Sequence, residues 1–148
     1  MTKRLAAFCA ALLSFVVFLT VALWGATFGI DGNTSSALGP GSTVPINVRI
    51  SNPHFYPIVV TGLHVRIASI TPAHKGAICR LSNYSLTQAK PVTVHLGPFS
   101  SASMKSIAAS SSEWPSLHLT GISAKLDDGC QGATINLAYS AAGTWWAK

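Results

Sequence analysis

The chain has 148 residues, of which 49% are hydrophobic and only 9% are charged, and its formal net charge is +6. The length suits one domain plus a targeting segment, and the charged fraction is far below the roughly 25% of an ordinary soluble domain. The basic residues are scattered and form no stripe or run, which argues against a nucleic-acid-binding protein.

Residues 1–30 are predicted to be a membrane anchor or signal segment. Lys3 and Arg4 precede residues 5–24, which carry no charge and are long enough to cross a hydrocarbon core of about 30 Å. The two cations predict a cytoplasmic N-terminus, with the rest of the chain outside. A cleaved signal peptide is the alternative, although its apolar run is normally about 7 to 15 residues. We therefore expect a single-pass membrane protein with an extracellular domain, or otherwise a secreted one.

Residues 31–43, which are rich in Gly, Pro and Ser, predict a flexible tether, and residues 44–148 predict the folded domain. Residues 44–51 alternate between apolar and polar side chains, which is typical of a strand with one buried face. The segment "NPHFYP" at 52–57 predicts a turn because its prolines fix the backbone and remove donors. A second strand is expected directly after this turn.

The rest of the chain predicts shorter strands separated by turns. They are expected near residues 92–96, near Met104 and Ile107, over 117–122 and over 133–139. No stretch after residue 30 has a convincing helical period. Six or seven short strands with Gly, Pro and Ser between them predict an all-β fold, an immunoglobulin-like antiparallel β-sandwich preceded by one transmembrane or signal helix.

Cys79 and Cys130 are the only cysteines after residue 30, and they are predicted to form a disulfide because exported chains meet oxidising conditions. Neither lies in a CxxC or CxH motif, so no metal site is expected. Cys9 lies within the apolar segment, where it is expected to act as a small apolar residue.

The sequence predicts no enzyme and no cofactor. Its four carboxylates are Asp31, Glu113, Asp127 and Asp128, and none belongs to a recognisable catalytic motif. The five histidines have no ligand spacing and are expected on the surface: His54, His64, His74, His95 and His118.

Aromatic residues are the remaining functional candidates. Phe55 and Tyr56 lie in the predicted turn, and Trp145 and Trp146 lie near the end of the sequence. Exposed aromatics stack on sugars or rest at a membrane surface, so these four are candidate ligand or membrane contacts. The alternative, that they plug the end of the sandwich, stays open for the two tryptophans. Trp114 is expected to pack in the core.

Three stretches resemble a group of uncharacterised actinobacterial exported proteins. They are "LGPGSTVPINVRISNPHFYPIVVTGLHV", "EWPSLHL" and "CQGATINLAYS", and the resemblance covers most of residues 22–140. It implies an N-terminal hydrophobic segment and one immunoglobulin-like sandwich, but no activity. The group more often has a second Asn after the turn proline, where this chain has His54.

These expectations combine into a function without catalysis. The chain is predicted to be a membrane-tethered extracellular β-sandwich, a structural or interaction module of the cell envelope. Its expected partners are the membrane, through residues 5–24, and a cell-wall polymer or an envelope protein. The alternative is a secreted or anchored module that binds cell-wall carbohydrate or an anionic polymer through its aromatics and basic surface.

Overall fold

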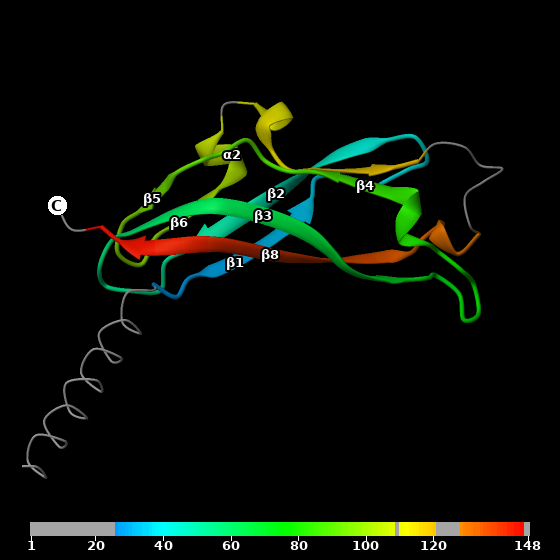
Figure 1. Cartoon of the computed structure of the whole chain (residues 1–148), viewed down its shortest axis with the longest axis horizontal. Helices are drawn as coiled ribbons and strands as arrows, with labels where there is room; N and C mark the ends of the chain where they lie inside the picture. Colours follow the sequence, from blue (N-terminus) through cyan, green and yellow to red (C-terminus); the bar gives the residue numbers. More distant parts are fainter. Residues whose placement is uncertain (1–25, 109, 121–127, 147–148) are drawn as a thin grey trace, which may run out of the picture.

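The computed structural model describes residues 26–108, 110–120 and 128–146, which form a mostly β structure with two antiparallel sheets (Figure 1). The five-stranded sheet has the order β1-β2-β7-β4, with β6 also pairing with β2, and the three-stranded sheet has the order β5-β3-β8. The strands are β1 (Gly29–Thr34), β2 (Thr43–Ser51), β3 (Ile58–Thr71), β4 (Tyr84–Thr87), β5 (Val94–Leu96), β6 (Ser101–Ser103), β7 (Ser116–Leu119) and β8 (Thr134–Trp145).

The alternation expected in residues 44–51 is present in strand β2. Val44, Ile46, Val48 and Ile50 are buried, whereas the residues between them are exposed or half-buried. The same core cluster includes Ile58, Val60 and Val65 of β3, so it joins the two sheets. Burial of these aliphatic side chains supplies the main driving force for bringing the sheets together.

The predicted tether begins inside the fold, so that expectation is wrong for residues 31–34. Strand β1 pairs antiparallel with β2 from Gly29 opposite Ser51 to Thr34 opposite Ile46. Ala26, just before β1, is buried in the core, and its backbone N–H donates to the carbonyl of Gly143 at 3.3 Å. The folded domain therefore includes residues 26–34 as well as those from residue 44 onward.

The segment around Met104 and Ile107 also differs from the expected strand. It forms a single helical turn, α2 (Met104–Ile107), directly after β6. Ser103 and Ser106 form a capping box, in which the side chain of each accepts a hydrogen bond from the backbone of the other. These bonds give partners to the first free N–H groups of the helix. The buried Met104 fixes this turn against the core.

Of the predicted anchor or signal segment, residues 1–25 lie outside the described residues, whereas residues 26–30 belong to the β structure: Ala26 is buried in the core, and Gly29 and Ile30 pair with β2. Within residues 26–108, 110–120 and 128–146, no helix is long and apolar enough to cross a bilayer. The short helical turns there are α2, η1 (Leu81–Asn83), η2 (Ser111–Glu113) and η3 (Asp128–Cys130).

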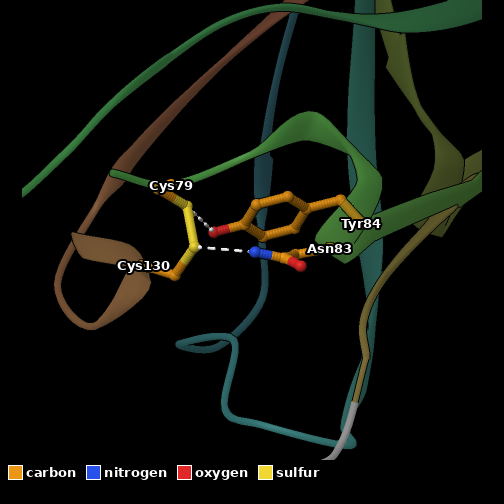
Figure 2. The surroundings of a disulfide bond; sticks show 4 residues. All are labelled: Cys79, Asn83, Tyr84 and Cys130. Atoms are coloured by element: carbon orange, nitrogen blue, oxygen red, sulfur yellow. Dashed lines mark hydrogen bonds between the residues drawn. A yellow bond between two sulfur atoms is a disulfide. The ribbon is translucent and has the colours of Figure 1, made fainter. Parts of the chain in front are cut away.

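The structure confirms the predicted disulfide between Cys79 and Cys130 (Figure 2). The bond links the segment before η1 to the end of η3, four residues before β8 begins. The hydroxyl of Tyr84 lies 3.3 Å from Cys79 Sγ, and Asn83 Nδ2 donates to Cys130 Sγ at 3.3 Å. The bond therefore fastens the start of β8 beside β4, at the end of the domain opposite the β2–β3 turn (Figure 1).

Candidate functional site

Five aromatic residues gather at one end of the domain, and we call this surface the aromatic end. It consists of Phe55, Tyr56, Phe99, Trp145 and Trp146, which come from the β2–β3 turn, the β5–β6 turn and the end of β8. These three segments lie together at the left of Figure 1. The surface thus unites residues that are up to 91 positions apart, from Phe55 to Trp146.

Strand register brings the tryptophans to the turn. Ile58 of β3 pairs with Trp145 of β8, which places Trp145 directly beside residues 52–57. The ladder continues one residue further, because the backbone N–H of Trp146 donates to the carbonyl of Pro57 at 3.2 Å. The two tryptophans are therefore held by backbone pairing and are not a loose tail.

Tyr56 is the centre of an aromatic stack. Its ring lies parallel to that of Trp145, with centroids 3.8 Å apart, and to that of His54, at 4.6 Å. At these centroid distances the rings of His54 and Trp145 would overlap if both lay on the same face of Tyr56. They therefore lie on opposite faces of Tyr56. Trp146 contacts His95 edge to face, at 4.9 Å. Both faces of Tyr56 are thus already occupied by protein.

This stack weakens the interpretation of the site as a sugar-binding platform. Binding a sugar by stacking requires a free aromatic face. Tyr56 offers none, and Trp145 offers only the face turned away from Tyr56. The most exposed side chains of the cluster are those of Phe55 and Phe99.

Buried Asn52 positions both turns of the aromatic end. Its amide Nδ2 donates to the carbonyls of Tyr56 and Gly97, each at 2.8 Å, and its Oδ1 accepts from the backbone N–H of His54 at 3.0 Å. Its side chain is 2% exposed, and all of these groups are satisfied without water. Sequence analysis identified residues 52–57 only as a turn and missed this role, which an Asn before Pro signals weakly.

The other predicted aromatic, Trp114, is half-buried and packs against the core, with an indole N–H that is buried and lacks a hydrogen-bond partner among the described residues. Two histidines lie at the aromatic end: His54 stacks on Tyr56, and His95 contacts Trp146. His118 lies elsewhere, with its Nδ1 2.9 Å from the Thr43 hydroxyl. In the described part of the chain no three metal-ligating side chains come together.

A second feature is an open cleft of about 560 Å³ between β1 and β8, near the disulfide. Leu38, Leu117 and Leu137 supply apolar walls, and Tyr139 closes one side. The Tyr139 hydroxyl is buried without a hydrogen-bond partner among the described residues. Burial, and secondarily the nearby Asp31 carboxylate, raise the pKa of Tyr139. The described lining residues include no charged side chain.

Comparison of the chain with protein-family models, curated proteins and solved structures gives no match. The resemblance to actinobacterial exported proteins therefore stays an expectation, and the candidate site depends on the geometry alone.

Proposed function

We propose that this chain is a structural or interaction module of the cell envelope, without catalytic activity. In this proposal residues 5–24 span the membrane once, and an immunoglobulin-like β-sandwich stands outside the cytoplasm. The observation that carries the proposal is the Cys79–Cys130 pairing, because disulfides persist in oxidising compartments and are rare in the cytosol. The uncharged segment that leads into Ala26 supplies the route of export.

The placement of charged residues supports a role without catalysis. Asp31 lies opposite Arg49 in the β1–β2 ladder, and Glu113 Oε1 accepts from Lys90 Nζ at 3.1 Å on the surface. These two carboxylates come from separate parts of the fold. An acid–base pair needs two such groups at one reacting centre.

Fractionation of cells that express the full chain tests the anchor. We expect the intact chain in the membrane pellet after a carbonate wash, and digestion by protease added outside the cell. Leu13→Arg should release the chain from the membrane or block export, because a charge at the centre of a span costs about 3 kcal/mol. Leu13→Ala is the matched control and should remain in the pellet.

Thiol labelling of the same samples tests the location. Under denaturing conditions without reductant, we expect labelling at Cys9 only, whereas after reduction Cys79 and Cys130 should also react. Recovery of the full chain from cytosol with all three thiols reactive would overturn the proposal. Recovery of a shortened chain from the medium alone would replace the anchor by a cleaved signal peptide.

A further inference from the structure

The aromatic end carries four of the six large apolar side chains that are exposed on the described surface. Phe55 is 76% exposed, Phe99 73%, Trp145 50% and Trp146 38%. Single exposed apolar residues are common and need no explanation. These four, however, come from three separate segments and meet at one end, and clustering of this kind marks an interaction surface.

Phe99 is held in a backbone conformation that its side chain disfavours. It is the only non-glycine residue with positive φ among the described residues, at 49°. The turn is fixed by neighbouring bonds: Phe99 N–H donates to the carbonyl of His54 at 2.9 Å, and Ser100 Oγ donates to that of Gly97 at 2.8 Å. A bulky residue in the left-handed region is a genuine outlier, and a side chain that is 73% exposed gains little from burial to offset the cost. Contact with something outside the domain would explain its presence.

The path of the chain indicates which body outside the domain the aromatic end faces. The predicted span ends at residue 24, and the described chain begins at Ala26, whose N–H bonds to Gly143 beside the tryptophans. Thr27 contacts the ring of His54 in the stack. Two residues cover at most about 7 Å, so a span that ends at residue 24 would bring the bilayer close to Ala26. The bilayer would then be the nearest large body.

The charges at this end fit a bilayer surface. Residues 26–28, 52–57, 97–100 and 143–146 contain no carboxylate. Anionic lipids repel carboxylates, and Trp rings favour the headgroup region.

We propose that the aromatic end lies against the outer headgroup region of the bilayer that holds the chain's own apolar segment. This inference rests on the proposed function and adds an orientation to it. The domain stands with its disulfide end away from the membrane, and Phe55, Phe99 and Trp146 insert into the interface. A single point of attachment leaves a domain free to rotate, whereas this second contact fixes the faces that the domain presents to the envelope.

Depth-dependent fluorescence quenching tests the contact with the full chain in phosphatidylcholine–phosphatidylglycerol vesicles. Trp24→Phe and Trp114→Phe leave Trp145 and Trp146 as the only indoles. We expect lipids brominated in the upper acyl chain to lower their emission by roughly half, and aqueous acrylamide to quench them weakly, as for interfacial indoles. The control probe is Leu81→Trp in a chain whose four native tryptophans are Phe. It lies at the disulfide end and should show the opposite pattern.

A pair of double variants provides the second measurement. Phe55→Asp/Phe99→Asp should abolish the quenching by brominated lipid, because the two carboxylates cannot enter the interface. Ile78→Asp/Leu81→Asp changes two apolar residues at the disulfide end, each 58% exposed, and should leave the quenching unchanged. Urea midpoints show whether both variants are folded.

The outcomes separate the two proposals. If the chain floats with the vesicles but acrylamide alone quenches Trp145 and Trp146, the contact is wrong and the anchor stands. If the indoles respond to soluble wall glycans and not to brominated lipid, the aromatic end is a sugar site and the inference is overturned. If the chain does not float with the vesicles, the anchor and the contact fail together.

Discussion

Replacing Asn52 by alanine removes the side chain that joins the β2–β3 turn to the β5–β6 turn. The change deletes three hydrogen bonds, to Tyr56, Gly97 and His54, in a site that is 2% exposed to water. Each such bond contributes about 1 kcal/mol net, and its former partners lose it without free access to water. We therefore expect Asn52→Ala to lower the free energy of unfolding by about 3 kcal/mol.

Urea unfolding of the purified full chain in detergent, followed by tryptophan emission, measures this loss. With a slope of about 1 to 3 kcal/mol per molar, the midpoint should fall by about 1 to 3 M. Asn136→Ala is the matched control, because the Asn136 amide donates to Ser69 Oγ at an exposed position and its loss should cost about 0.5 kcal/mol or less. The assigned role of Asn52 would be refuted by a midpoint shift no larger than that of the control.

Three further predictions concern single features of the fold. Cys79→Ala/Cys130→Ala should lower the free energy of unfolding by about 4 kcal/mol, since the bond closes a loop with a sequence separation of 51; an equal urea midpoint with and without reductant would contradict this. Because the pKa of Tyr139 is raised in the fold, its contribution to stability is complete below the unfolded pKa of about 10 and is lost as the pH rises through the folded value. In Tyr139→Phe the free energy of unfolding should therefore fall less steeply above about pH 10, and it should change little at pH 7. If the free energy of unfolding had the same pH dependence in both proteins, the Tyr139 hydroxyl would not be the group responsible. Phe99→Asn should raise stability by about 1 kcal/mol, because Asn tolerates the left-handed region, and the same variant should weaken quenching by brominated lipid; a loss of stability instead would show that Phe99 contributes to the core.

Local pattern was sufficient to predict the strands whose burial alternates. Val44 to Ile50 and residues 133–139 have period two in the sequence; the first lies in β2, and the second lies in β8 from Thr134 onward. The disulfide followed from the cysteine count and the predicted export. These features could be predicted because they depend only on neighbouring residues or on composition, and both can be read from a single sequence.

The failures have two physical causes. Residues 29–34, "GIDGNT", have low strand propensity and become a strand only because β2 offers a pairing edge. The spacing of three between Met104 and Ile107 is a helical spacing, and Ser103 with Ser106 supplied a capping signal that the strand interpretation overlooked.

The aromatic end shows what a sequence leaves out. Phe55, Tyr56, Trp145 and Trp146 were identified as candidates one by one, but their meeting depends on the register of β3 against β8. Phe99 was not identified at all, because its signal is a backbone angle and not a residue pattern.

The pairing of β3 with β8 has a consequence for how the domain is made. The paired residues lie between 63 positions apart, from Thr71 to Thr134, and 87 positions apart, from Ile58 to Trp145. A chain that emerges from its N-terminal end exposes the longest strand well before its main partner exists. Until then one side of β3 is an open edge, which is a template for pairing with other chains. Chaperones that bind the unfolded chain, or rapid secretion through a narrow channel, would protect this edge. Any truncation before β8 would leave the edge of β3 permanently unpaired.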